Sequence, residues 1–158
     1  MTINGRAIRP ATGADAEAVS SVIAVTVRES NARDYEQDVL ETVVANSTPE
    51  RMRDMMREGD FLVAEEDGMI VGIVGLVEDW LRRFFVLPTV QGQGIGRDLL
   101  AAMERTALRN CLPVLRVNSS LTARGFYERL GFVSEGAYTR DGNRFVRMSK
   151  TLAGDEAV

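Results

Sequence analysis

Three glycines at positions 92, 94 and 96 separate a β-like run over residues 84–87 from an amphipathic segment over residues 99–108. A glycine inside a helix or strand costs about 0.5–1 kcal/mol relative to alanine, so this crowding indicates that a ligand comes close to the backbone there. The N–H groups of a first helical turn have no intrahelical partner, and the helix dipole adds about half a positive charge. The spacing therefore predicts a phosphate-binding turn between a strand and a helix.

Two common phosphate-binding motifs do not fit this turn. The dinucleotide fingerprint needs a third glycine where Arg97 stands, and an acidic residue near the end of the next strand, where Asn118 stands. The nucleotide-binding P-loop needs a Lys-Ser/Thr pair directly after its last glycine, and here Gly96 is followed by Arg97-Asp98. We therefore expect neither NAD nor ATP as the ligand.

The pattern that fits is Gln91-x-x-Gly94-x-Gly96, preceded by Val86-x-Pro88. It resembles the acetyl-CoA signature of the GNAT superfamily of N-acetyltransferases, which reads Arg/Gln-x-x-Gly-x-Gly/Ala. A second segment, residues 120–132 (SLTARGFYERLGF), is similar to the family's (N/S)xxAxxFYxxxGF hallmark. Residues 148–152 resemble its usual last strand, so the resemblance runs from Ile8 to Leu152 and is weakest over residues 28–58.

The resemblance implies how acetyl-CoA would be held. Backbone N–H groups of the turn would bind the pyrophosphate, and strand backbone would pair with the pantetheine arm and polarise the thioester carbonyl. Ser120 would contact the cofactor, although capping the helix that starts near Thr122 is an alternative. Arg97 would add a charge, or would simply be a solvated helix-start arginine. The implied cofactor-binding residues are Phe85, Val86, Gln91, Gly92, Gln93, Gly94, Ile95, Gly96, Arg97 and Ser120.

Tyr127 is the residue that the resemblance assigns to catalysis. Attack on acetyl-CoA expels a thiolate whose conjugate acid has a pKa near that of cysteine, about 8.5, whereas a tyrosine with a pKa of about 10 stays protonated. Tyr127 would therefore donate a proton to the sulfur. The alternative role is aromatic packing, which we expect for its neighbour Phe126.

The sequence leaves the general base open. There is no histidine, which excludes His-based triads and ordinary His/Cys zinc sites, and we expect no metal. A water chain to solvent would also serve. The carboxylate and phenol candidates are Glu78 and Asp79 on a strand connection, and Glu29, Asp34, Tyr35, Glu36 and Asp38 in a helical region.

Composition narrows the class of protein. The 158 residues carry a net charge of −4 without a basic block, so we expect no nucleic-acid partner. The longest apolar run, residues 69–77, falls short of the roughly 20 residues that span a bilayer, and no signal peptide is visible. Cys111 is the only cysteine; it suits a reducing cytoplasm, and we expect it to pack rather than to carry acetyl groups.

The elements predict a mixed α/β fold, with a mostly antiparallel sheet flanked by helices in the order β-α-α-β-β-β-α-β-α-β-β. Thr12 and Asp15 form a capping-box pattern, and residues 47–50 are a strong helix start. Asp67-Gly68 and Asp141-Gly142 are hairpin signals. We expect one domain over residues 1–152, followed by a flexible tail over residues 153–158.

Taken together, the sequence predicts an enzyme that transfers acetyl from acetyl-CoA to a primary amine of a small molecule or peptide by direct attack. The alternative is a non-catalytic module that binds or senses acyl-CoA, in which Tyr127 would serve only as packing. A homodimer stays open, and the acceptor amine is not indicated by any motif.

Overall fold

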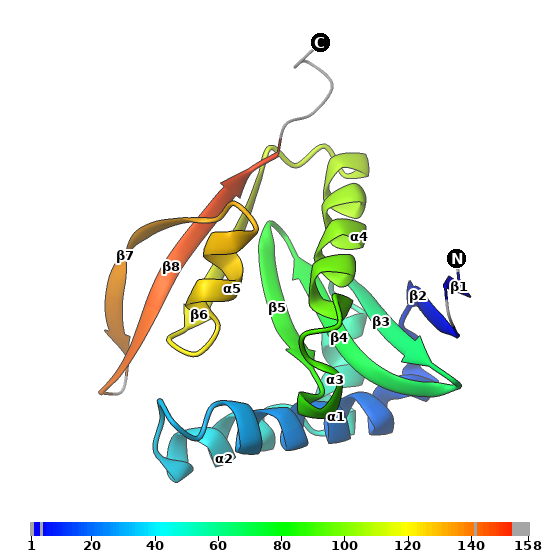
Figure 1. Ribbon diagram of the computed structural model, residues 1–158, viewed down its shortest axis with the longest axis horizontal. Helices are drawn as coiled ribbons and strands as arrows, with labels where there is room; N and C mark the ends of the chain where they lie inside the picture. Colours follow the sequence, from blue (N-terminus) through cyan, green and yellow to red (C-terminus); the bar gives the residue numbers. More distant parts are fainter. Residues whose placement is uncertain (1, 4, 141, 153–158) are drawn as a thin grey trace.

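The computed structural model describes residues 2, 3, 5–140 and 142–152, and it forms one mixed sheet with helices on both faces (Figure 1). The elements in chain order are β1 (Thr2–Ile3), β2 (Arg6–Pro10), η1 (Gly13–Asp15), α1 (Ala16–Ser30), α2 (Gln37–Ala45), α3 (Pro49–Met56), β3 (Asp60–Glu66), β4 (Met69–Val77), β5 (Trp80–Val86), η2 (Pro88–Val90), α4 (Ile95–Arg109), β6 (Val114–Ser120), α5 (Arg124–Arg129), β7 (Val133–Arg140) and β8 (Asn143–Thr151).

The predicted fold class and element order are confirmed with two additions. The short strand β1 precedes the expected first strand, and the region before β3 holds three helices rather than two. Helices α2 and α3 are separate because Thr48 caps a new helix, its hydroxyl accepting from the Arg51 N–H at 3.3 Å, with Pro49 in the first position. A proline there has no N–H to continue the preceding helix.

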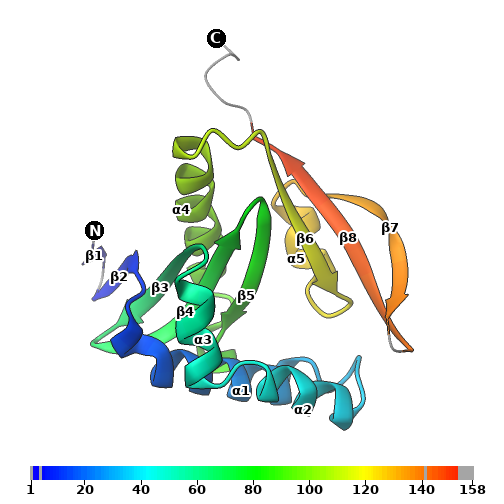
Figure 2. The same ribbon diagram turned by 180° about the vertical axis from the view of Figure 1, so that it is seen from behind.

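The strands follow the order β1-β2-β3-β4-β5-β6-β8-β7 across the sheet. Neighbours are antiparallel except β5 and β6, which run parallel and are paired only at Trp80 and Arg116. From that point the two strands diverge towards α1, as both ribbon views show (Figures 1 and 2). The sheet is therefore divided into two arms with a gap between them.

The hairpin signals have different outcomes. Asp67 and Gly68 both have positive φ, 50° and 83°, and join β3 to β4 in the tight turn that the sequence predicts. Strands β7 and β8 pair antiparallel as expected, but Asp141 of their connection lies outside the described residues, as does the expected tail over residues 153–158.

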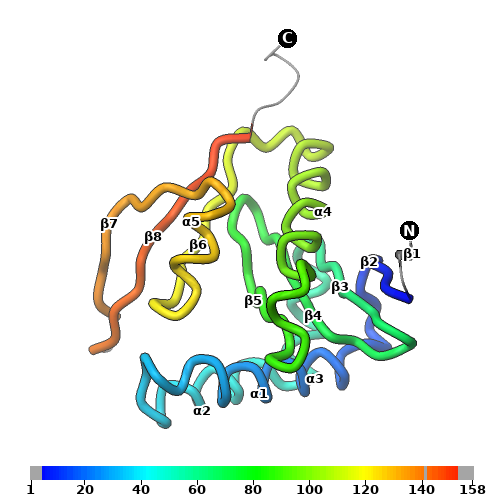
Figure 3. The backbone as a smooth tube through the Cα atoms, viewed as in Figure 1, coloured from blue at the N-terminus to red at the C-terminus, as the bar shows by residue number. Residues whose placement is uncertain are grey.

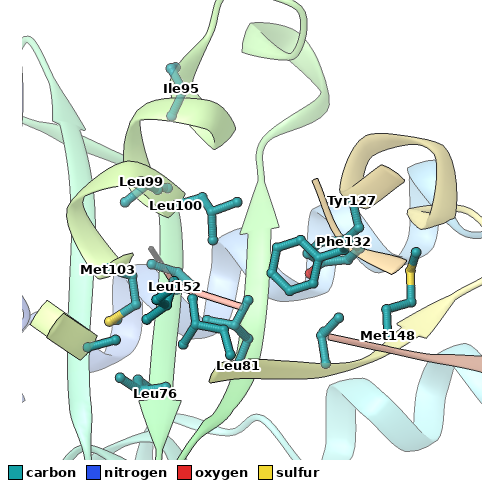
Figure 4. Packing of buried hydrophobic residues seen from close by; sticks show 14 of the residues in the cluster. Leu76, Leu81, Ile95, Leu99, Leu100, Met103, Tyr127, Phe132, Met148 and Leu152 are labelled. Carbon is teal, nitrogen blue, oxygen red and sulfur yellow. The ribbon is translucent and has the colours of Figure 1, made fainter. Parts of the chain in front are cut away.

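Hydrophobic side chains form a core on each face of the sheet. On one face, α4 contributes Leu99, Leu100 and Met103, and this core continues to Tyr127 and Phe132 in the other arm (Figure 4). On the opposite face, α1, α2 and α3 pack around Ile23, Leu40 and Met52, among others. Among the described helices, none is long and apolar enough to cross a membrane.

Candidate active site

The glycine turn has the backbone that its sequence predicts. Gly92 and Gly94 have φ of 84° and 86°, in the left-handed region where glycine is favoured over other residues. Gly94 is the N-cap of α4, and its carbonyl accepts from the Asp98 N–H at 3.0 Å. Figure 3 traces the turn from β5 past α1 into α4. The unpaired N–H groups of this first turn can therefore bind an anion.

Beside this turn a cleft of about 530 Å³ opens between the two arms of the sheet. Its lining includes nine of the ten residues expected to bind the cofactor, namely Phe85, Val86, Gln91, Gly92, Gly94, Ile95, Gly96, Arg97 and Ser120. Gln93 does not line it, because its carbonyl and its side-chain oxygen both accept from Arg6, at 3.2 and 3.3 Å.

Val86 offers its backbone to this cleft. The Leu87 N–H donates to Val71 of β4 at 2.9 Å, so by strand alternation the N–H and C=O of Val86 point away from β4 and into the gap. The same alternation turns the polar groups of Phe85 towards β4, so the expectation that the Phe85 backbone would pair with the pantetheine arm is wrong. Phe85 contributes its side chain to the cleft. The Val86 carbonyl accepts from Gln91 Nε2 at 2.8 Å.

Tyr127 lies on the opposite wall of the cleft, on α5. Its ring is 4% exposed and makes edge contacts with Phe84, Phe126 and Phe132. Burial raises the pKa of the Tyr127 hydroxyl well above its usual range. Nothing in the described part of the chain hydrogen-bonds this hydroxyl. It is a protonated donor on a residue that lines the cleft.

Some of the residues that are expected to bind the cofactor also make contacts within the protein. A Cβ on Gly96 would lie 3.1 Å from the Phe126 ring, so this glycine is needed for packing. Ser120 Oγ accepts from the Ala123 N–H at 3.2 Å, which is the capping alternative, although α5 itself begins only at Arg124. Arg97 is exposed at the cleft and lies 3.8 Å from Asp98.

The structure adds residues that sequence reasoning missed. Thr26, Ser30 and Asn31 at the end of α1 line the cleft, and Arg129 of α5 adds a second cation beside Arg97. Helical spacing marks the apolar face of α1 but carries no signal for the polar residues that the divergence of β5 and β6 brings to the cleft. The motif segment contains Arg129, yet its family pattern leaves that position unspecified.

None of the candidate carboxylates lines the cleft. Asp79 accepts from Arg116 Nε at 3.0 Å near the start of β5, far along the strand from Val86. Asp34 accepts from the Thr122 hydroxyl at 2.6 Å. The Tyr35 hydroxyl donates to the Arg144 carbonyl at 2.9 Å and accepts from the Leu121 N–H at 2.8 Å. Its pKa is raised by burial.

Cys111 is exposed, so the expectation that it packs is wrong. It has a φ of 62° directly after α4, a left-handed position that ends the helix and turns the side chain outward. Cys111 lines neither this cleft nor the one next to it.

A second, smaller cleft of about 230 Å³ adjoins the first. The two share Asn31, Phe84, Phe85, Ser120, Ala123 and Tyr127, so they meet where β5 and α5 face each other beside the end of α1. A ligand with its phosphates on the glycine turn would extend its other end to this junction. A second reactant would approach from the smaller cleft.

Comparison with known proteins agrees with this geometry. The model of the acetyltransferase (GNAT) domain family matches residues 31–152. The chain therefore belongs to the GNAT acetyltransferase family, which confirms the predicted family and enzyme class. As a member of this family it uses acetyl-CoA as acetyl donor, as the glycine motif predicts.

Solved structures share its fold. The GCN5-related N-acetyltransferase from Rhodopseudomonas palustris superposes with a TM-score of 0.88 at 24% identity, over 96% of this chain and 99% of that one. The PaiA N-acetyltransferase from Thermoplasma acidophilum, solved with coenzyme A, gives 0.78 at 20% identity over 96% and 99%. YncA from Salmonella typhimurium, solved with acetyl-CoA, gives 0.68 at 21% identity over 94% and 95%.

Proposed function

We propose that this acetyltransferase moves the acetyl group of acetyl-CoA directly onto a primary amine in the gap between β5 and β6. The observation that carries the proposal is the pair of groups facing this gap, the Val86 backbone on one side and the Tyr127 hydroxyl on the other. The Val86 N–H can donate to the carbonyl oxygen of a thioester, and the Tyr127 hydroxyl can donate to its sulfur. The two fold neighbours solved with coenzyme A or acetyl-CoA are consistent with the donor.

The chemistry follows from those two groups. The amine, once deprotonated, attacks the thioester carbon and forms a C–N bond, while the Val86 N–H stabilises the oxyanion. The C–S bond then breaks, and the thiolate takes its proton from the Tyr127 hydroxyl. The proton lost by the amine goes to water, since no Asp or Glu of the described residues lines either cleft. The tyrosine recovers its proton from solvent.

A turnover screen tests this function. Release of the CoA thiol is followed with acetyl-CoA and, in turn, polyamines, amino acids, aminoglycosides and peptide N-termini as acceptors. We expect thiol release that depends on one class of amine, together with the N-acetylated product by mass spectrometry. Acetyl-CoA binding without amine-dependent release would favour the acyl-CoA-sensing alternative instead.

Direct attack has its own test. Intact-protein mass spectrometry after mixing with acetyl-CoA alone should show no added acetyl group. Within the described residues, the cleft is lined by no cysteine and by no Asp or Glu that could activate a hydroxyl. A stable acetyl adduct that an amine then removes would contradict direct transfer. The predicted cytoplasmic location and homodimer rest on the sequence alone and stay predictions.

A further inference from the structure

The smaller cleft contains an arginine in an unusual backbone position. Between β4 and β5 the pairing shifts from Ile73–Phe85 to Gly75–Arg82, so β5 carries one extra residue and forms a β-bulge. Arg83 lies in this bulge with a φ of 52°. Bulges with a left-handed residue normally use glycine there. A non-glycine residue at such a position carries backbone strain, and strain of this kind is found often at functional sites.

Within the described residues, the guanidinium of Arg83 has no counter-ion. Its Nε is buried and has no hydrogen-bond partner, and only Nη2 makes a bond, to the Asn46 carbonyl at 3.2 Å. No carboxylate of the described residues lies within 4 Å of it. Burial and the nearby charges of Arg82 and Arg51 lower its pKa. Arg83 is therefore a partly buried cation close to other cations. A bound anion would offset both the loss of solvation and the repulsion between these charges.

A second unpaired polar group faces the same cleft from β6. The Oδ1 atom of Asn118 is buried without a partner, and its amide nitrogen makes no hydrogen bond within the described part of the chain. Because both ends of the amide are unpaired, the conclusion is the same whichever way the amide is turned. Asn118 can accept from an amine or donate to a carboxylate.

Apolar side chains complete the cleft. Val39, Leu40 and Val43 of α2 form one wall, and Phe145 of β8 closes the other side. The volume of about 230 Å³ is below the roughly 300–1,000 Å³ of drug-sized ligand sites. The occupant is therefore small, with an apolar body and polar groups at fixed places.

We propose that the acceptor, given the amine acetylation argued above, is a small amino acid with an apolar side chain. Its carboxylate pairs with Arg83. Its amine lies between Asn118 and the junction with the larger cleft, which we call the donor cleft because acetyl-CoA is proposed to bind there. A planar carboxylate matches the fork of a guanidinium. Arg82 also lines the cleft, but its guanidinium lies over the Trp80 ring, so Arg83 is the arginine left to pair with the carboxylate.

Matched acceptors test the proposal. Leucine, leucinamide and isoamylamine share one apolar body and one amine, but only leucine carries a carboxylate. We expect kcat/KM for leucine to exceed both others by about 10–100-fold, the worth of hydrogen bonds to a charged group. Phosphoethanolamine, as a phosphate-bearing amine, should be a poor acceptor. Equal values for the first three would overturn the proposal and leave amine acetylation intact.

Variants locate the carboxylate site. Arg83→Gln should remove the preference for leucine over isoamylamine, mainly through KM, and Arg83→Lys should restore part of it. Asn118→Ala should weaken all three acceptors. Arg57→Gln removes the same charge from an exposed residue paired with Asp54 and should change nothing. The melting shift given by acetyl-CoA, unchanged in each variant, shows that the fold and the donor cleft persist.

Calorimetric titration gives an answer that does not need turnover. With CoA present, leucine should bind at least about tenfold more tightly than leucinamide, and Arg83→Gln should abolish the difference. If leucine binds no better than leucinamide, or if Arg83→Gln keeps the difference, the carboxylate site is wrong. Failure of all amines in turnover, with leucine still bound through Arg83, would instead contradict the proposed acetylation.

Discussion

At the scale of single residues, the surroundings of Tyr127 suit a proton donor. Its hydroxyl makes no hydrogen bond to the described protein, and burial raises its pKa. A raised pKa keeps the phenol protonated at neutral and mildly alkaline pH, and it also makes the phenol a weaker acid, so its donation depends on its position beside the sulfur.

Replacing Tyr127 with phenylalanine should separate chemistry from binding. The ring contacts with Phe84 and Phe132 are kept, so stability and acetyl-CoA affinity should change little, the latter by well under tenfold. Loss of the donor should lower kcat near the lower end of the roughly 10²–10⁴-fold range of general acids, since water replaces part of it. The defect should shrink above about pH 8.5, where the thiolate leaves unaided. Steady-state kinetics across pH measures both effects. A normal kcat for the variant below pH 8 would show that Tyr127 only packs in the core and does not act as a proton donor.

The residues of the site differ in how far they can be predicted. Motif spacing identifies Gly94 and Tyr127, because the resemblance assigns a position to each. It gives no indication of Arg83 or Asn118. These two residues stand out only because each has a buried polar atom without a hydrogen-bond partner in the folded chain. Burial without a partner depends on contacts from α2, β6 and β8, which a linear pattern does not contain.

At the scale of elements, the glycine turn combines two demands that a mutation can separate. Gly94 needs its left-handed backbone, with a φ of 86°, whereas Gly96 is limited by Phe126. Gly94→Val forces a β-branched residue into that conformation and adds bulk where we expect the pyrophosphate to bind. Gly96→Val pushes directly against a ring of the core.

We expect Gly94→Val to lower acetyl-CoA affinity by more than about tenfold in a protein that stays folded. Gly68→Val is the matched control, because Gly68 has a φ of 83° in the turn between β3 and β4, with open space around it. Both variants should lose about 1–2 kcal/mol of stability to the left-handed strain. Calorimetry should show lost affinity for Gly94→Val alone. Unchanged affinity in that variant would mean that this turn does not hold the phosphates.

The connection from β2 into α1 gives a pH-dependent prediction. Arg9 lies 2.9 Å from Asp15, whose carboxylate also accepts from the Thr12 N–H at 2.8 Å, the predicted capping box. The hydrogen bond from Arg9 is the largest cause that lowers the pKa of Asp15, from 3.8 to about 2. A lowered pKa stabilises the fold above pH 4, and this stabilisation is lost as the pH falls from about 4 to 2.

Asp15→Asn should therefore cost about 2 kcal/mol of unfolding free energy at pH 7, and less at pH 3. Urea unfolding at the two pH values measures this difference. Glu17→Gln is the control, because Glu17 is in an exposed ion pair with Arg53 and should contribute little. A cost that does not vary with pH would show that Asp15 acts through its shape rather than its charge.

The elements themselves were largely predictable, but their arrangement was not. Turn chemistry at Asp67-Gly68 and the Thr48-Pro49 helix start appear in the structure as expected, because these signals act over four residues or fewer. The divergence of β5 from β6 has no local signal. It depends on two strands that are separated in sequence by residues 87–113 and that pair only at Trp80 and Arg116. The bulge at Arg83 is hidden for the same reason.

At the scale of the whole molecule, a ligand in the donor cleft would contact both arms of the sheet. The arms share one strand pair, so a ligand that touches β5, α4 and α5 links parts that the sheet itself joins weakly. Acetyl-CoA at a hundredfold excess over its dissociation constant should stabilise the fold by about 2.7 kcal/mol. A thermal melt detects this, and NAD or ATP should give much smaller shifts. Equal shifts for all three would contradict a site selective for acetyl-CoA.

The position of acetyl-CoA is the most direct test of the account, and a crystal structure of the complex measures it. We expect the pyrophosphate on the N–H groups of residues 91–97 and the thioester carbonyl on the Val86 N–H. The sulfur should then lie within hydrogen-bonding reach of the Tyr127 hydroxyl. Acetyl-CoA bound outside the gap between β5 and β6, or with its sulfur remote from Tyr127, would contradict the proposed site.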